Sequence, residues 1–167
     1  YLAGAADVGL EFRPQGADFT AYCDASFEAH RSTTGSAVTH CGCALAWRSA
    51  KQPQVAKSTA DSEETALAAT VSMAENVRAL LESMYIPAHS MNVGCDNQAC
   101  IILSTGEGWH KTKALANRVY YVREMVKLGQ LVIFYIVTDE QKADVLTKFL
   151  VAAKIEAARR QLCLVRA

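Results

Sequence analysis

Glu63 is an acidic residue at the head of a helical stripe that is otherwise apolar or small. The segment 59–81 has no Pro or Gly and is rich in Ala, Leu, Met and Glu, so it predicts a helix with Ser58 or Thr59 as N-cap. Steps of three and four residues from Glu63 reach Ala66, Leu67, Thr70, Ala74, Val77 and Leu81. A lone carboxylate on that face costs several kcal/mol unless it is protonated or meets a cation. No Lys or Arg follows on the stripe, and a metal ion is one way to satisfy the acid.

The neighbouring acids Asp61 and Glu64 have a simpler interpretation. Both lie in the first turns of the helix, where the helix dipole favours negative charge. Steps from Glu64 reach a more polar row: Ala68, Glu75 and Arg78. Glu63 is therefore the acid of this helix that needs partners from elsewhere in the chain.

Three further acids stand at positions typical of a site. Asp24 lies inside the alternating segment 17–27, which predicts a strand, and aspartate is disfavoured in strand interiors. Asp96 ends a short predicted strand, where open α/β sheets place their sites, although it could instead cap the next helix. Asp144 lies among apolar neighbours in the second turn of the last predicted helix, and an ordinary early-helix acid is the alternative.

These four carboxylates predict a site for hard divalent cations. Clustered without a cation, they would repel one another and raise one another's pKa values. Mg²⁺ prefers carboxylate and water oxygens. Two such ions can stabilise the attacking and leaving oxygens of a phosphoryl displacement.

The elements that must position these acids follow from the hydrophobic pattern. The segment 17–27 predicts one strand, and 28–35 predicts a turn or loop. The segment 36–49 predicts two short strands or one bulged strand, with Gly42 at the break. The long helix follows these strands.

Strands and helices alternate in the second half of the chain. The segments 91–98 and 130–137 predict strands, and the helices are expected at 98–105, 112–129 and 138–162. The last of them begins with a capping box formed by Thr138 and Gln141. The predicted fold is α/β: a five-stranded mixed sheet, in which a three-strand antiparallel meander is joined by two parallel strands, with helices on both faces.

Composition limits the classes of protein. The 167 residues suffice for one domain, and 17 basic residues balance 17 acidic ones, so any basic groove for nucleic acid must be local. No apolar run is long enough to span a membrane, and the first residues show no secretory signal. The missing initiator Met fits a piece of a longer chain. The six irregularly spaced cysteines indicate reduced thiols, and the run His40–Cys43 is weak evidence for half of a zinc site.

Several motifs carry a family resemblance along nearly the whole chain. They are "YCDAS", "RSTTGSAV", "AWRSAKQPQVAKST", "SEETALAA", "CDNQACI" and "YIVTDEQKADVLTKFL". The chain resembles the ribonuclease H domain of copia-type (Pseudoviridae) LTR-retrotransposon Pol polyproteins. The segment "YLAGAADVGLEF" resembles the connection to reverse transcriptase. The resemblance thus implies a connection segment at 1–16 and a ribonuclease H-like domain at 17–167.

The resemblance implies hydrolysis of the RNA strand of RNA:DNA hybrids during reverse transcription. Two Mg²⁺ ions, with Mn²⁺ as a substitute, would be held by Asp24, Glu63, Asp96 and Asp144. Water would attack phosphorus and leave 5′-phosphate and 3′-hydroxyl ends. The family pattern Glu-Ala-Glu-Tyr aligns its second Glu with Glu63, the residue that the helical period also selects.

The chain departs from the family at positions other than these four. Ser26 replaces a frequent second acid, and Ala114 and Ala116 replace the His and Asp of a His-Ile-Asp run. No His precedes "KADVL", where cellular ribonucleases H carry one that helps product release. These departures concern substrate positioning and turnover more than the class of chemistry.

Candidate substrate contacts lie beside the acids and in one basic and aromatic run. Ser26, Asn97 and Gln98 suit contacts with the backbone and 2′-hydroxyl groups of a hybrid. Trp109, Lys111 and Lys113, with Arg118 and Arg123 on the following helix, suit the DNA strand, although a solvated helix face is the alternative. Arg48 and Lys51 form a second candidate patch, with plain protein surface as the alternative.

Three other functions remain in view. A catalytically silent module would grip the hybrid or pack on the polymerase, and metal-dependent cleavage separates it from a nuclease. An integrase or transposase would place its Glu on a later helix. A zinc-binding regulator would carry metal when purified. The expected partners are the hybrid and the reverse transcriptase domain, without a membrane. The expected location is intracellular, in cytoplasmic virus-like particles and also in the nucleus.

Overall fold

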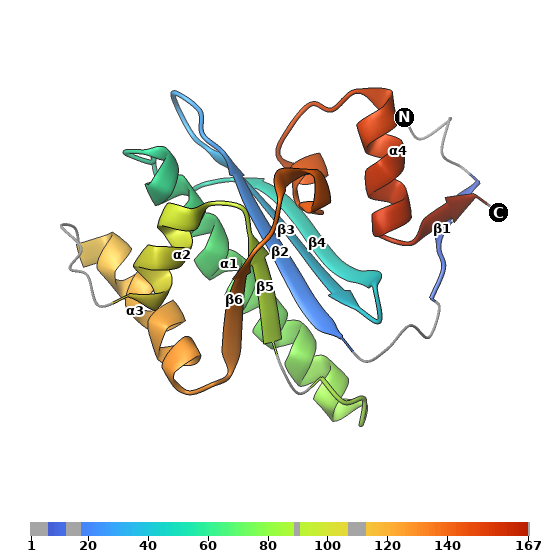
Figure 1. Ribbon diagram of the computed structural model, residues 1–167, viewed down its shortest axis with the longest axis horizontal. Coiled ribbons are helices and arrows are strands. Elements are labelled where there is room, and N and C mark those ends of the chain that lie inside the picture. Colours follow the sequence, from blue (N-terminus) through green and yellow to red (C-terminus); the bar gives the residue numbers. More distant parts are fainter. Residues whose placement is uncertain (1–6, 13–17, 89–90, 107–112, 167) are drawn as a thin grey trace.

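The computed structural model describes residues 7–12, 18–88, 91–106 and 113–166, with the side chains of 113–116 left aside. Its centre is a five-stranded mixed sheet in the order β4-β3-β2-β5-β6 (Figure 1). The first three of these strands form an antiparallel meander, and β5 and β6 add parallel to β2. The predicted fold class is thereby confirmed.

The two inner strands of the meander are buried on both faces, whereas the edge strand is exposed over much of its second half. The strands of the meander are β2 (Phe19–Ser26), β3 (Thr33–His40) and β4 (Cys43–Lys51), joined between β3 and β4 by a tight turn. Cys41 and Gly42 both have positive φ in that turn, the geometry that two-residue hairpins favour. The segment 36–49 is therefore two strands, with a register shift after Val38.

Helix α1 (Thr59–Ser83) begins as the sequence predicts. The Ser58 side chain accepts a hydrogen bond from the Asp61 backbone N–H, as an N-cap does. The sequence places Glu64 on the more polar row of the helix, which would leave it exposed to solvent. This expectation is wrong, because Glu64 is buried, with 1% of its surface exposed. Helices α2 (Gln98–Thr105) and α3 (Lys113–Lys127) pack against that side of α1 and cover it.

The parallel strands β5 (Met91–Cys95) and β6 (Leu131–Tyr135) lie beside β2. Gly94 and Cys95 pair in register with Tyr22 and Cys23 of β2. This register brings the carboxyl end of β5 next to the middle of β2. Asp24 follows Cys23 and Asp96 follows Cys95, so the two acids lie in the same region of the sheet.

The C-terminal segment differs from the single helix that the sequence predicts over 138–162. Two 3-10 turns, Thr138–Glu140 and Asp144–Leu146, precede the shorter helix α4 (Ala152–Gln161). The Gln141 side chain does not close a capping box. Its amide Nε2 donates to the carbonyl oxygens of Cys23 at 2.9 Å and Gly94 at 3.4 Å. Bonding to the sheet therefore replaces the expected helical turns, and Asp144 opens a 3-10 turn above the strands.

A second, two-stranded sheet pairs the described ends of the chain. Strand β1 (Val8–Leu10) runs antiparallel to β7 (Leu164–Arg166). Figure 1 shows this pair beside α4, away from α2 and α3. The sequence patterns predict neither strand.

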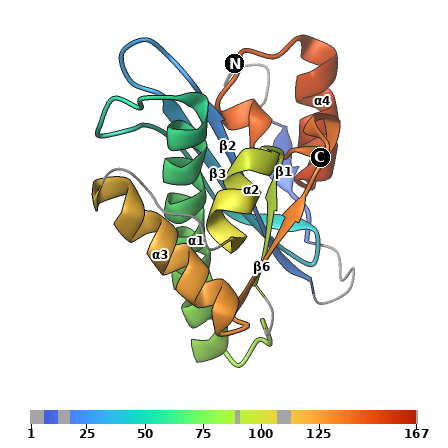
Figure 2. The ribbon, with the colours of Figure 1, turned by 60° about the vertical axis from the view of Figure 1, so that its left-hand side comes forward.

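Helices cover both faces of the central sheet (Figure 2). The larger apolar core lies between α1 and one sheet face, and includes Phe19, Leu67, Val71, Val93 and Leu131. A smaller core on the opposite face joins Tyr22, Ala37 and Ala44 to Ile136 and Leu162. Within the described residues, no helix combines the length and apolar character of a membrane span.

Gly35 permits the close approach of the C-terminal segment to the sheet, and replacing it should be costly. A Cβ on Gly35 would meet Thr147 Cγ2 at 2.6 Å and the Ala143 carbonyl oxygen at 2.8 Å. We expect Gly35→Ala to lower the free energy of unfolding by about 1–3 kcal/mol in urea denaturation. Gly9→Ala, whose Cβ would meet nothing within 4 Å, is the matched control. Equal unfolding midpoints for the two variants would contradict this account of Gly35.

Candidate metal centre

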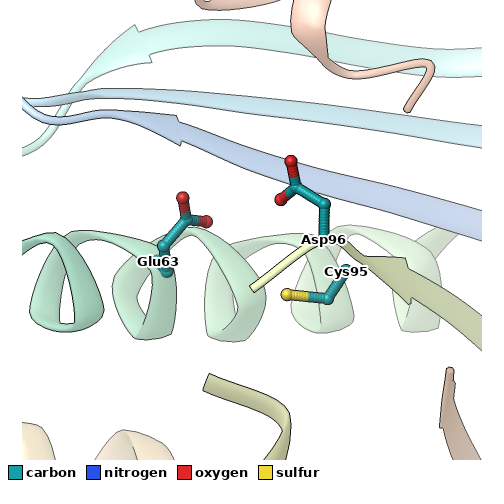
Figure 3. A group of neighbouring side chains, drawn as sticks. All are labelled: Glu63, Cys95 and Asp96. Atoms are coloured by element: carbon teal, nitrogen blue, oxygen red, sulfur yellow. The ribbon is translucent and has the colours of Figure 1, made fainter. Parts of the chain in front are cut away.

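The four predicted acids converge from four separate elements. In the described part of the chain, Asp24, Asp96 and Asp144 offer ligand oxygens that all lie within 4.8 Å of one another. Glu63, Cys95 and Asp96 form a second group with the same spacing (Figure 3). Asp96 belongs to both groups and joins them. Neither group includes Cys41 or Cys43, so the zinc half-site considered for His40–Cys43 gains no support.

Glu63 is the acid with the strongest need for a cation. It is 5% exposed, and its Oε2 atom is buried with no hydrogen-bond partner among the described residues. Burial, reinforced by the charge of Asp24, raises the pKa of Glu63 to about 9. At neutral pH the Glu63 carboxyl therefore holds a proton unless a cation replaces it.

Asp24 is held by groups of the C-terminal segment. Its Oδ2 accepts a hydrogen bond from the Thr147 hydroxyl, and its Oδ1 lies 3.3 Å from Lys148 Nζ. Lys148 Nζ also lies 2.6 Å from Asp144 Oδ1. Burial opposes the charge on Lys148, but the bond with Asp144 and the charge of Asp24 prevail and raise its pKa. Lys148 thus supplies one positive charge between two of the acids.

The other two acids are less buried and also have raised pKa values. Burial, followed by the charge of Asp24, raises the pKa of Asp96. Burial likewise raises the pKa of Asp144, although its hydrogen bond with Lys148 opposes the shift. The oxygen-rich donor set and the orphaned Glu63 oxygen fit a divalent metal ion, because such an ion favours the charged form of every carboxylate it contacts.

Glu64 has a separate and internal environment. The Ser104 hydroxyl of α2 lies 3.3 Å from each of its carboxylate oxygens. Burial raises the pKa of Glu64 to about 7, against the lowering effect of Ser104 and of nearby Arg123. The side chain thus joins α1 to α2, and neither cluster of candidate ligands includes it.

The predicted substrate contacts have mixed placements. Ser26 ends β2 and donates to Glu28 at 3.3 Å, while Asn97 caps α2 through the Cys100 N–H at 3.0 Å. Gln98 is exposed at the start of α2. Trp109 and Lys111 lie outside the described residues, as does the side chain of Lys113.

The basic residues expected on α3 do not share one surface. Arg123 is 8% exposed and donates to the Leu103 carbonyl at 2.9 and 2.6 Å, so it is not part of an exposed basic face. Arg118 donates to Thr65 Oγ1 at 2.9 Å. Arg118 also lines a groove of about 350 Å³ together with Arg48 and Lys51. Arg118 therefore lies with the second candidate patch.

Sequence reasoning missed the side chains that position the acids. Gln141 anchors the segment before Asp144, and Thr147 and Lys148 contact Asp24. Lys148 follows Asp144 by four residues, a spacing that indicates an ion pair wherever the chain is helical. The approach of the Cys95 sulfur to Glu63 had no comparable signal in the sequence.

Comparison with known proteins defines the fold first. Solved structures that resemble the chain include LC11-RNase H1, isolated from compost by a metagenomic approach, with a TM-score of 0.61 and 17% identity over 79% of this chain and 94% of that one. The N-terminal RNase H domain of rv2228c from Mycobacterium tuberculosis gives a TM-score of 0.60 and 14% identity over 87% and 98%. LC11-RNase H1 is also known in complex with an RNA/DNA hybrid. The chain therefore has the ribonuclease H fold.

Sequence similarity then identifies the relatives of the chain. The chain is 31% identical over 164 residues, 95% of its length, to the retrovirus-related Pol polyprotein from transposon TNT 1-94 of Nicotiana tabacum. It is 31% identical over 156 residues to the Pol polyprotein from transposon RE2 of Arabidopsis thaliana. It spans 12% and 11% of these polyproteins, and no protein-family model matches it. Its homologues are plant copia-type Pol polyproteins, as its motifs predict.

The raised pKa of Glu63 predicts a pH dependence of stability. The unfolded chain loses this proton above about pH 4.5, whereas the folded chain keeps it to about pH 9. The protonated form contributes its full stability below about pH 4.5. This contribution is lost as the pH rises from about 4.5 to about 9. In EDTA, Glu63→Gln should therefore be more stable than the parent by about 1–3 kcal/mol at about pH 8 and similar at about pH 4.

Chemical denaturation at a series of pH values measures this difference. Glu82→Gln is the matched control, because it removes a 62%-exposed carboxylate from the far end of the same helix. It should show the pH dependence of the parent. An identical pH dependence for Glu63→Gln and the parent would refute the account of a buried, protonated Glu63.

Proposed function

We propose that this domain hydrolyses the RNA strand of RNA:DNA hybrids during retrotransposon reverse transcription. The observation that carries the proposal is the convergence of Asp24, Glu63, Asp96 and Asp144 on a ribonuclease H fold. Homology to retrovirus-related Pol polyproteins supplies the context of reverse transcription. The products would carry 5′-phosphate and 3′-hydroxyl ends.

The four acids would hold two Mg²⁺ ions, with Mn²⁺ as a substitute. These ions would stabilise the negative charge that develops on the attacking and leaving oxygens. Thr147 and Lys148 fix the orientation of Asp24, and Gln141 holds the segment that carries Asp144 against the sheet. Lys148 is 38% exposed in its side chain, so its ammonium group can also turn toward a phosphate.

Substrate contacts would surround this centre. Ser26, Asn97 and Gln98 flank the acids and suit contacts with the RNA backbone. Arg48, Lys51 and Arg118 line a groove beside α1 and suit a phosphate backbone, although Lys51 is paired with Glu28 at 2.6 Å. The run of Trp109, Lys111 and Lys113 is retained as a contact with the DNA strand.

The wider assignment follows from the parent polyproteins. Residues 1–16 would be the end of the connection to reverse transcriptase, and residues 17–167 the nuclease domain. The pairing of β1 with β7 would then fasten that connection to the domain. The reverse transcriptase domain would be the partner, within virus-like particles in the cytoplasm and in the nucleus.

A cleavage assay tests the proposed function. A labelled RNA annealed to DNA should be cut with Mg²⁺, whereas single-stranded RNA, double-stranded DNA and samples in EDTA should remain intact. Asp24→Asn should lower the rate at least about 100-fold, because it removes a ligand charge. Asp139→Asn, an acid that is 86% exposed, should retain activity. Absence of cleavage with Mg²⁺ and Mn²⁺, in this domain and in a fusion to the polymerase, would establish the silent module instead.

The adjacent acids of α1 should differ in their effect on the same reaction. Glu63→Gln should abolish cleavage and metal-dependent stabilisation, because Glu63 faces Asp96 and Cys95. Glu64→Gln should retain most of the cleavage, because Glu64 bonds to Ser104 and an amide can replace it there. Thermal unfolding with and without Mg²⁺, beside the cleavage assay, measures both effects. Loss of cleavage in Glu64→Gln with retention in Glu63→Gln would reverse the assignment.

A further inference from the structure

The thiol of Cys95 distinguishes the second ligand group from the all-oxygen group. Glu63, Cys95 and Asp96 each offer one ligand atom, and the three atoms lie within 4.8 Å of one another. Figure 3 shows Glu63 on α1 with its carboxylate on the same side as that of Asp96, which follows Cys95 directly in the chain. A donor set of one sulfur and two oxygens suits a metal ion softer than Mg²⁺.

The burial of this group points to a ligand rather than to an accidental cluster. Cys95 is fully buried and Glu63 is 5% exposed. The Glu63 Oε2 atom is one of the few buried polar atoms that find no partner among the described residues. The Cys95 sulfur lies 3.8 Å from the Asn97 carbonyl oxygen and also interacts with the thiols of Cys100 and Cys23. An ion between α1 and β5 would supply the partner that the Glu63 Oε2 atom lacks.

We infer that Glu63, Cys95 and Asp96 form a binding site for a thiophilic divalent cation of the Zn²⁺ class. Zinc takes cysteine sulfur and carboxylate oxygen together, and three protein ligands leave a further position for water. Because Glu63 and Asp96 are also ligands in the proposed function, zinc bound here would compete with Mg²⁺. That consequence rests on the proposed function, whereas binding by the three side chains does not.

Cadmium titration of the full chain under reducing conditions tests the site. Cd²⁺ replaces Zn²⁺ at such sites and gives an ultraviolet charge-transfer band when it binds a thiolate. The parent protein should show this band with one equivalent of Cd²⁺. Cys95→Ser should lose it and bind cadmium at least about tenfold more weakly. Cys100→Ser is the matched control, because it removes a neighbouring buried thiol that lies outside the group, and it should keep the band.

Two further measurements keep the outcomes distinct. Cadmium NMR of the parent protein should indicate one sulfur ligand among oxygen ligands. This measurement needs no variant, so it does not depend on whether a variant folds. A spectrum of several sulfur ligands, or a band that survives in Cys95→Ser, would overturn the inference in favour of Cys23, Cys100 or the more exposed thiols. Added Mg²⁺ should weaken the band. Cadmium binding without Mg²⁺ competition, together with absence of hybrid cleavage in this domain and in its fusion to the polymerase, would leave this site standing and would refute the proposed function.

Discussion

The crowding of carboxylates at one place on the sheet is the constraint on which the rest of the structure depends. Asp24 and Asp96 come from neighbouring parallel strands, and α1 and the C-terminal segment bring Glu63 and Asp144 against them. Like charges at this spacing repel, and the protein limits the cost with Lys148, with the hydroxyl of Thr147 and with protonation of Glu63. The fold holds the acids together more tightly than their own electrostatics would allow.

The sequence predicted most of the scaffold because its patterns are local. The alternation over β2, the break at Gly42 and the uninterrupted helix α1 each reflect the residues within one element. The sheet order follows, because a hairpin meander and parallel crossovers leave few arrangements. The helical period alone also predicts that Glu63 lies on the buried stripe, and the side chain is indeed buried.

The errors arose where long-range contacts override local preference. The segment 138–148 reads as a helix, but the Gln141 amide bonds to two carbonyl oxygens of the sheet and the chain forms 3-10 turns instead. Glu64 reads as a polar-row residue, yet α2 and α3 cover it and Ser104 bonds to it. The pairing of β1 with β7 joins residues that are more than 150 positions apart in the sequence, a relation that no local pattern encodes. The clustering of the acids was predicted, but the residues that orient them were not.

Asp96 belongs to both groups of candidate ligands, and this sharing has a thermodynamic consequence. A cation that engages Asp96 from one group changes the charge and orientation that the other group offers. The free energy of that coupling is reciprocal, so each cation must alter the affinity of the other by the same factor. When both groups bind cations, they would therefore behave as one linked system through the shared carboxylate at the end of β5.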